Sequence, residues 1–448
     1  MMCEFGVVVA SSTGHVKAFD FSSKSPINLC SLGSKKISTI SWDTSAGSVL
    51  LGTKEGSIVR QDLNSAADIV EHNFTDGSVV SLLPINQHVV SVYSDGVIKC
   101  LNGETLQQES EIKTPGNLCC GRTLGSLVAA GGRECNLHVW DLNQPENPVF
   151  TAKNLRPTTL QLEVPVWISD VCFVPQYDGR ILLTASRIGE LCLYDIRCGQ
   201  RRPVSRHAWR LSRKYGKIKV GKYAHGAVLP DLSVIRPITK ALAFDDAPGT
   251  GIRVVAGNAI GDLCFLDMRL PRERVVQSNE NELTTVGRVK SCGSRAAEPP
   301  VSVRTLAGAS GSITALACGG CSTANFPLAR QSAIMNNENV LIASSLDRYL
   351  RLYNRETGVR LAKLYAKVPI TSFLVSDSAS LEKLSSISPD SDRQLTSEET
   401  DKKQETSNSE SEDSEIDELF DLMEPVDEQE EKYVRKGLPK NGKRRRRK

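Results

Sequence analysis

The sequence predicts an all-β protein, a β-propeller of seven blades, and three observations support this prediction. A hairpin unit recurs seven times, an apolar strand recurs seven times between the hairpins, and the first hairpins end at a regular spacing. Short strands with turn signals roughly every 8–12 residues are typical of all-β folds. Radial repetition leaves only short strand edges exposed, so a propeller accommodates this kind of array.

Each hairpin unit contains an alternating strand, a polar turn that usually includes glycine, and a second strand that ends near Asp or Asn. The seven units are residues 7–21, 49–63, 89–105, 127–142, 181–197, 253–269 and 340–358. The first four end at Asp20, Asp62, Asn102 and Asp141, which are 42, 40 and 39 residues apart. This spacing is close to the length of roughly 40–45 residues that a four-stranded propeller blade requires.

A strand of small and apolar residues precedes every hairpin except the first. These strands are residues 37–42, 78–84, 116–121, 168–175, 238–244, 312–318 and 370–375. The first hairpin has no such strand before it, and 370–375 has no hairpin after it. We therefore expect the last strand to complete the first blade, which closes the ring and ends the propeller domain, residues 1–376.

Three segments depart from the repeat: a basic insertion at 198–236, a further loop at 270–310 and a tail at 377–448. The tail is rich in serine and charged residues and has few aromatic ones, a composition typical of disorder. It is acidic at 410–431, with twelve acids and no base, and basic at 432–448, with ten bases and no acid.

The basic insertion is the strongest candidate binding site. From Cys198 through Pro230 it holds nine basic residues and no acidic one. They are Arg201, Arg202, Arg206, Arg210, Arg213, Lys214, Lys217, Lys219 and Lys222. Cationic groups neutralise phosphates, and the interleaved aromatic rings can stack on unpaired bases. We expect contact with RNA or an RNA-containing particle; a solvated charged insertion is the alternative.

Two features of the tail predict further roles. The final basic run consists of Lys443, Arg444, Arg445, Arg446, Arg447 and Lys448, and such runs are typical of nuclear targeting. Within the acidic part, Ile416, Leu419, Phe420 and Met423 are spaced to form one apolar stripe on a helix. We interpret this stripe as a short docking helix for a protein partner, with plain disorder as the alternative.

Motifs of catalysis and of metal binding are missing from the sequence. There is no phosphate-binding glycine loop, no H-E-x-x-H and no G-x-S-x-G. Cys318 and Cys321 form a single C-x-x-C without the second pair that a zinc site needs. We expect no enzymatic activity, no cofactor, no metal and no small-molecule substrate. We also expect no membrane span, because no apolar run of ~18 residues occurs, and an intracellular location.

Several motifs resemble a known family. The repeats, with "LHVWDL" at 137–142, are similar to WD40 repeats. The block "VPVWISDVCFVPQ…ILLTASRIGELCLYDIRCGQRRPV" (164–204), together with "GNAIGDLCFLDMR", "LAGASGSITALAC" and "ASSLDRYLRLY", resembles the WD-repeat-containing protein 74 family. The resemblance implies a nucleolar assembly factor for the large (60S) ribosomal subunit that acts in rRNA processing. It also implies docking on pre-60S particles and release by an AAA ATPase.

A second function remains open from the sequence. WD40 substrate receptors of cullin-RING ubiquitin ligases have a W-D-x-R ending, and "YDIR" (194–197) and "LDMR" (266–269) are similar to it. The same D-x-R pattern also arises from ordinary hydrogen bonding in a turn.

Overall fold

The structure, a computed structural model, describes most of residues 5–377. Its gaps are 22–25, 44–47, 63–68, 75–76, 158–159, 176, 212–233, 245–251, 269–300, 307–308 and 320–338. The chain divides into two units, Met1–Pro389 and Asp390–Lys448, and all described residues belong to the first. The tail stripe and the terminal basic run therefore lie outside the described residues.

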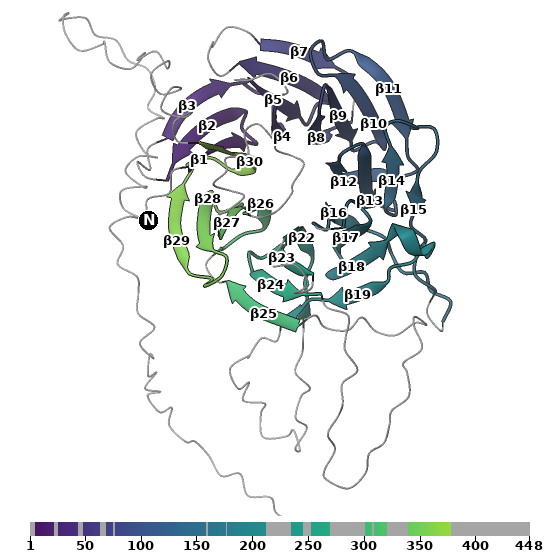
Figure 1. Cartoon of the computed structure of the whole chain (residues 1–448). Coiled ribbons are helices and arrows are strands. Elements are labelled where there is room, and N and C mark those ends of the chain that lie inside the picture. Colours follow the sequence, from purple (N-terminus) through teal and green to yellow (C-terminus); the bar gives the residue numbers. More distant parts are fainter. Residues whose placement is uncertain are drawn as a thin grey trace, which may run out of the picture. The chain divides into compact units, whose positions relative to one another are not determined.

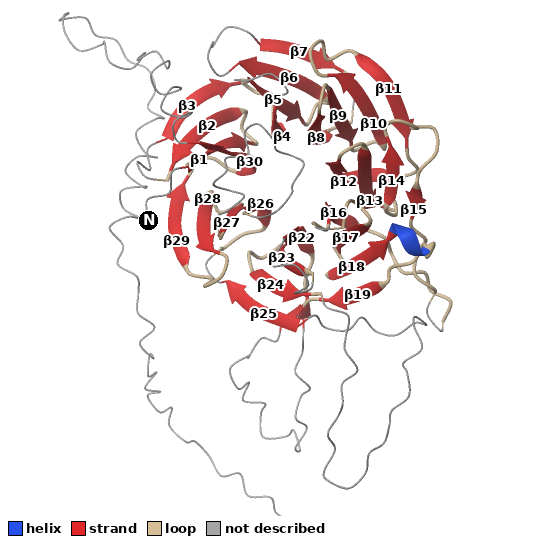
Figure 2. Cartoon of the chain, in the orientation of Figure 1, coloured by secondary structure: helices blue, strands red, loops and turns tan. Residues whose placement is uncertain are grey.

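Strands dominate the described part of the chain, which contains a single 3₁₀ turn, η1 (Ile196–Cys198) (Figure 2). None of its helical segments is long and apolar enough to cross a membrane. Seven four-stranded sheets surround a common centre (Figure 1), which confirms the predicted seven-bladed propeller.

The blades are numbered here in chain order. Blade 1 contains β30 (Ile370–Asp377), β1 (Phe5–Ser11), β2 (His15–Asp20) and β3 (Pro26–Ser31). Blade 2 contains β4 (Ile37–Trp42), β5 (Ser48–Thr53), β6 (Ser57–Asp62) and β7 (Ile69–Asn73). Blade 3 contains β8 (Val79–Ile85), β9 (His88–Tyr93), β10 (Val97–Asn102) and β11 (Gln108–Lys113).

The remaining blades follow the same order from the centre outward. Blade 4 contains β12 (Asn117–Leu124), β13 (Leu127–Arg133), β14 (His138–Asp141) and β15 (Phe150–Thr151). Blade 5 contains β16 (Ile168–Phe173), β17 (Ile181–Ser186), β18 (Glu190–Asp195) and β19 (Ser205–Ala208). Blade 6 contains β22 (Ile238–Phe244), β23 (Arg253–Asn258), β24 (Leu263–Asp267) and β25 (Val301–Leu306). Blade 7 contains β26 (Ile313–Cys318), β27 (Val340–Ser345), β28 (Tyr349–Asn354) and β29 (Arg360–Tyr365).

Blade 1 closes the ring, as the sequence predicted. Strand β30, the last of the chain, pairs antiparallel with β1, with Val9 opposite Phe373. The contact extends into the next blade, because the indole Nε1 of Trp42 donates to the carbonyl oxygen of Val375 at 3.3 Å. Two strands from opposite ends of the propeller sequence thus complete a single sheet.

The innermost strands share a β-bulge near their start, where one residue has no partner on the second strand. These residues are Ser38, Val80, Cys119, Ser169, Thr239, Thr314 and Thr371. A bulge increases the local twist of a strand. The Ser169 hydroxyl contacts the carbonyl oxygen of Ile238 in the next blade at 2.7 Å, and Ser38 contacts that of Val79 at 2.5 Å. The bulge therefore also joins neighbouring blades.

The hydrophobic core lies between the blades. Each apolar cluster connects adjacent sheets, and the clusters together run round the whole ring. The packing is close: a Cβ atom added to Gly257 of blade 6 would lie 2.8 Å from Cγ1 of Ile313 in blade 7. Gly52 has the same relation to Val79 of blade 3, at 2.6 Å. Glycine at these positions allows one sheet to lie directly on the next.

A partly buried ionic cluster fixes the turn between β27 and β28. The Asp347 carboxylate accepts hydrogen bonds from Arg351, from Ser345 and from the backbone N–H groups of Ser310 and Tyr349. Burial raises the pKa of this carboxyl, but these hydrogen bonds outweigh burial and lower its pKa to about 2. Because Ser310 precedes β26, the cluster ties the connection that enters blade 7 to a turn of the same blade.

Two predicted loops contain strands. The insertion predicted at 198–236 includes β19, the outermost strand of blade 5, and the short pair β20 (Arg210–Leu211) and β21 (Val234–Ile235). The loop predicted at 270–310 includes β25, the outermost strand of blade 6. Outermost strands have one free edge, and their apolar and polar residues alternate only weakly. The sequence pattern therefore did not distinguish them from loops.

Ring closure can be tested by truncation. A chain that ends at residue 365 lacks β30 and leaves β1 with an unpaired edge, so we expect loss of cooperative thermal unfolding. A chain that ends at residue 378 keeps β30 and should melt like the full chain. Equal melting of the two truncated proteins would contradict the closure.

The Asp347 cluster predicts a dependence of stability on pH. A carboxyl whose pKa is lower in the folded state stabilises the protein above its unfolded pKa, near 3.8, and this contribution disappears as the pH falls toward about 2. We expect the Asp347→Asn variant to be less stable than wild type at neutral pH, with a difference that shrinks over this range. Urea unfolding at several pH values measures it, and a difference independent of pH would contradict the assignment.

Candidate interaction surface

One face of the propeller collects the segments that enter and leave the blades. Because neighbouring strands are antiparallel, the innermost and third strands of each blade begin at this face, and the second and fourth strands end there. In blade 5 the N–H of Arg187 donates to the carbonyl oxygen of Trp167 at 2.9 Å. The N–H of Trp209 donates to the carbonyl oxygen of Gly189 at 3.0 Å. We call this the start face.

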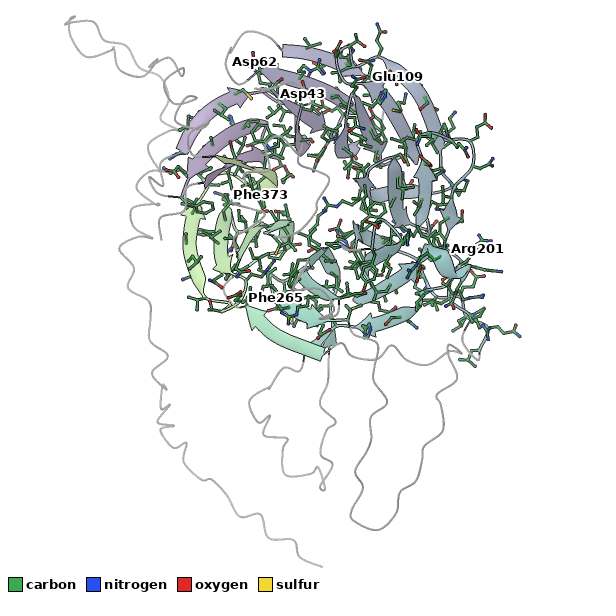
Figure 3. All side chains as sticks on the ribbon, in the orientation of Figure 1. Asp43, Asp62, Glu109, Arg201, Phe265 and Phe373 are labelled. Carbon is green, nitrogen blue, oxygen red and sulfur yellow. The ribbon has the colours of Figure 1, made fainter. Side chains whose placement is uncertain are left out.

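The described cations of the basic insertion do not lie on one surface. Arg201 lies at the rim of the ring (Figure 3), and its Nε donates to the carbonyl oxygen of Thr151 at 2.7 Å. The Nε of Arg202 donates to the carbonyl oxygen of Asn154 at 3.0 Å. These two arginines therefore connect a turn of blade 5 to the segment that leaves blade 4. Their guanidinium groups remain positively charged.

The next residues of the insertion follow blade 5 toward the start face. Arg206 lies on β19 and pairs with Glu190 on β18, with its Nε 2.7 Å from Oε2. Arg210 begins the short pair β20–β21, and only its backbone is described. The other predicted contacts lie outside the described residues: Arg213, Lys214, Lys217, Lys219 and Lys222. The structure thus assigns three of the nine cations to the propeller wall.

Trp167 stands on the start face between blades 4 and 5. It pairs with Arg133 in an isolated antiparallel bridge, and its carbonyl oxygen also accepts from the hydroxyl of Ser186 at 3.1 Å. The guanidinium carbons of Arg133 and Arg187 lie 5.4 Å and 5.9 Å from the centroid of the indole ring. The side chain of Trp167 remains 40% exposed. Its backbone is fixed by two turns, and one arginine from each turn flanks the ring.

The arginines beside Trp167 differ from those that build the blades. Within the described residues, blade arginines such as Arg60, Arg206 and Arg351 each have a carboxylate within 2.8 Å. Arg133 is 59% exposed, and its Nε lies 3.8 Å from the carboxylate of Glu134, which is 81% exposed. Such an exposed pair contributes little to stability. Arg133 and Arg187 therefore carry positive charge at the surface, and the structure of the blades does not depend on this charge.

Apolar side chains extend the start face on both sides of Trp167. Leu160 and Leu162 are exposed on the connection that enters blade 5. Ile260 and Leu346 are exposed on the turns between the second and third strands of blades 6 and 7. Exposed apolar groups beside cations are typical of binding surfaces. Blades 4–7 therefore present the best candidate interaction surface of the described residues.

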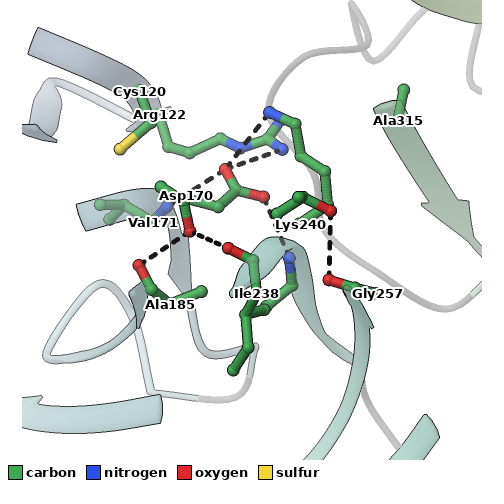
Figure 4. Close-up of polar contacts among 12 residues, drawn as sticks. Cys120, Arg122, Asp170, Val171, Ala185, Ile238, Lys240, Gly257 and Ala315 are labelled. Carbon is green, nitrogen blue, oxygen red and sulfur yellow. Dashed lines mark hydrogen bonds and ion pairs between the residues drawn. The ribbon is translucent and has the colours of Figure 1, made fainter. Parts of the chain in front are cut away.

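A buried carboxylate joins three innermost strands near the centre of the ring (Figure 4). Asp170 of β16 is 2% exposed, and its Oδ2 accepts from the N–H of Ala241 in β22 at 3.1 Å. Its Oδ1 accepts from the N–H of Val171 at 3.1 Å and lies 3.6 Å from Arg122 and 3.9 Å from Lys240. Every oxygen of the carboxylate is engaged by the propeller itself, so this cluster is a structural link between blades 4, 5 and 6.

One group of the described residues could hold a metal ion. His88, Cys100 and Glu109 place their ligand atoms within 4.8 Å of one another, and Nδ1 of His88 lies 2.9 Å from Oε2 of Glu109. Burial, followed by the charge of Glu109, raises the pKa of the Cys100 thiol. A metal would require the thiolate, which this environment disfavours. Cys318 is buried in blade 7, and Cys321 lies outside the described residues.

The sequence did not identify Trp167 or Asp170 as special. Asp170 had a signal, since it is an acid within an otherwise apolar innermost strand, "ISDVCF". Trp167 had only the weak signal of an aromatic residue just before a strand. Its arginine neighbours are 34 residues earlier and 20 residues later in the chain, so only the fold brings the three together.

Asp170 can be tested by charge removal. The Asp170→Asn variant keeps one oxygen acceptor but leaves Arg122 and Lys240 facing each other without an anion. Removal of one partner of a buried ion pair costs about 3–5 kcal/mol, and partial solvation of the two cations reduces the expected loss to about 2–3 kcal/mol. Asp195→Asn, which removes a more exposed carboxylate paired with Arg197, is the control and should cost under about 1 kcal/mol. Equal losses in urea unfolding would contradict the link.

Comparisons with known proteins agree with this architecture. No protein-family model matches the chain. A chain of the crystal structure of the mitotic checkpoint complex superposes with a TM-score of 0.51 at 13% identity, and the match covers 77% of this chain and 83% of that one. At that identity the likeness shows the fold alone.

Sequence relatives carry two names. The chain is 25% identical over 280 residues to WD repeat-containing protein 74 of Bos taurus, covering 59% of this chain and 65% of the relative. It is 35% identical over 146 residues to the Homo sapiens protein of the same name, covering 33% and 30%. It is 24% identical over 257 residues to ribosome biogenesis protein NSA1 of Yarrowia lipolytica, covering 56% and 49%.

The matches span less than two thirds of the length of each of these three relatives. The repeat architecture and the agreement among these relatives make the chain similar to WD repeat-containing protein 74 and to ribosome biogenesis protein NSA1.

Proposed function

We propose that the chain is a non-enzymatic scaffold that acts in ribosome biogenesis, as an assembly factor of the large (60S) subunit. The observation that carries this proposal is its similarity to a protein named for ribosome biogenesis, NSA1 of Yarrowia lipolytica, over more than half of the chain. In this proposal the protein docks on pre-ribosomal particles in the nucleolus and supports rRNA processing.

The propeller supplies a rigid platform in this proposal. Its start face carries exposed apolar groups over blades 4–7, and the basic insertion leaves the sheet beside Gly189 and returns just before β22. Lysine and arginine side chains in that insertion would bind rRNA phosphates and release counterions, which makes binding sensitive to salt. Arg201 and Arg202 at the rim would provide a second, smaller phosphate contact.

The tail would connect the scaffold to transport and to protein partners. We propose that residues 443–448 direct nuclear import, since six consecutive cations form a strong targeting signal. The stripe of Ile416, Leu419, Phe420 and Met423 would dock as a short helix on a partner protein. Release of the scaffold by an AAA ATPase of ribosome maturation is part of the same proposal.

The described residues favour this scaffold role over the alternatives. The buried carboxylates Asp43 and Asp170 and the partly buried Asp347 are all engaged by hydrogen bonds or ion pairs from the propeller. In the D-x-R turn at 195–197, Nε and Nη2 of Arg197 lie 3.0 Å and 2.8 Å from the Asp195 carboxylate. Local hydrogen bonding thus accounts for that motif, and no observation specifically favours a ligase receptor.

Sedimentation of the tagged protein from cells tests the proposal. We expect wild type to migrate with pre-60S particles and to crosslink to large-subunit rRNA precursors. Glutamine at the five cations of the insertion that follow Arg210 should weaken this association by at least about tenfold, because several phosphate contacts are lost. The five are Arg213, Lys214, Lys217, Lys219 and Lys222.

A charge-matched variant is the control. It places glutamine at five exposed cations on other blades: Lys36, Lys54, Lys113, Arg360 and Lys367. This variant should sediment like wild type.

Deletion of 443–448 should reduce nuclear import, and Leu419→Ala/Phe420→Ala should remove a protein partner from the particle. Sedimentation of the wild-type protein as a light, RNA-free species would overturn the assembly role.

A further inference from the structure

We infer that Trp167, Arg133 and Arg187 form a binding site for an unpaired nucleobase of single-stranded RNA and its flanking phosphates. The inference rests on the proposed function, because it assumes that RNA is the partner on the start face. It assigns this contact to residues outside the basic insertion, at the seam between blades 4 and 5.

The backbone that carries the indole ring is held by both neighbouring blades. The chain on which it lies is held on one side by blade 4, where the N–H of Glu134 donates to the carbonyl oxygen of Val166 at 3.0 Å. On the other side it is held by blade 5 through Arg187 and Ser186. All these contacts use the backbone of 166–167, so none of them depends on the indole itself. The backbone at Trp167 therefore loses little conformational entropy when a base stacks on the indole.

The chemistry around the ring fits a base and its phosphates. Aromatic rings and guanidinium planes are the groups on which unpaired RNA bases stack. Two guanidinium groups border the indole, and neither has a tight carboxylate partner among the described residues. Each can therefore turn toward a phosphate on either side of the stacked base. The hydrogen bond from Trp209 to Gly189 also brings the part of the basic insertion around Trp209 to the same end of blade 5.

The site is distinct from other aromatic residues of the protein. Trp42, Trp140 and Trp209 are buried, so Trp167 is the only exposed one of the four tryptophans. Tyr365, on the outermost strand of blade 7, matches Trp167 in exposure at 40%. Its ring is tilted against that of Tyr349, with the centroids 4.9 Å apart, and the ammonium group of Lys363 lies 3.7 Å from the centroid of the Tyr349 ring. Tyr365 offers a control with similar exposure and a neighbouring cation.

The experiment measures binding of a labelled single-stranded RNA of ~12 nucleotides, and of the same sequence as a duplex, to the full chain. The single strand should quench the intrinsic tryptophan fluorescence, because the exposed indole stacks on a base. Trp167→Ala should weaken single-strand binding by roughly 5- to 150-fold, and Trp167→Phe should retain most of it. Tyr365→Ala should bind like wild type.

The arginines give a separate readout. Arg133→Ala/Arg187→Ala should reduce the slope of log affinity against log salt by about 1.4, since each lost phosphate contact contributes about 0.7 for a single strand. Arg133→Lys/Arg187→Lys should keep that slope and lose part of the affinity, because lysine has charge but no stacking plane.

Two outcomes would overturn the inference. One is single-strand binding without tryptophan quenching, a result that needs no variant and is therefore independent of folding. The other is equal RNA affinity of the Trp167→Ala and Tyr365→Ala proteins; loss of a protein neighbour by Trp167→Ala would then assign the surface to a protein partner. Either outcome with sedimentation on pre-60S particles intact would leave the proposed function standing. Loss of sedimentation by wild type would remove both.

Discussion

Packing of each sheet against its neighbours is the constraint on which this structure depends. A four-stranded sheet of this size has two apolar faces and cannot shield either one alone. Each blade therefore requires the blades on both sides, and the contact is close enough that Gly52 and Gly257 admit no side chain. The same requirement explains why apolar clusters run round the ring in place of a single central core.

The polar groups of the interior serve the same packing. Asp170 satisfies an N–H on the innermost strand of the next blade, and the Ser169 hydroxyl does the same for a carbonyl oxygen. Buried polar groups with full hydrogen bonding fix one arrangement of neighbouring elements. Charged groups that do not connect neighbouring strands in the interior lie on the surface. They are found at the rim, at Arg201, and on the start face, beside Trp167. This separation is what distinguishes interaction residues from structural ones here.

The sequence predicted the inner three strands of the blades and the closing strand, because most residues of these strands are buried and the strands read as short apolar segments bounded by turns. It did not predict most outermost strands. In β11 and β29 only one residue of six is buried, so their alternation is too weak to separate them from loops. For the same reason β19 and β25 were assigned to insertions.

Sites were harder to predict than strands. The basic insertion is visible as composition, but the fold divides its described residues between the rim and the start face. Trp167 becomes a candidate binding residue because arginines from two different turns lie beside its ring. No local sequence pattern connects these three residues. A site built from single residues on separate repeats requires the ring geometry before it can be recognised.

Closure by the last strand has a consequence for synthesis. The hydroxyl of Thr371 meets the carbonyl oxygen of Ala10 across 361 residues of chain. At a translation rate of ~5–20 residues per second, the strand Phe5–Ser11 waits roughly 20–70 seconds before its partner emerges. During that time an apolar strand edge is open to wrong pairing, both within the chain and with other nascent chains. Blade 1 is therefore the first to be made and the last to be finished, and the nascent protein depends on protection of that edge until translation has passed β30.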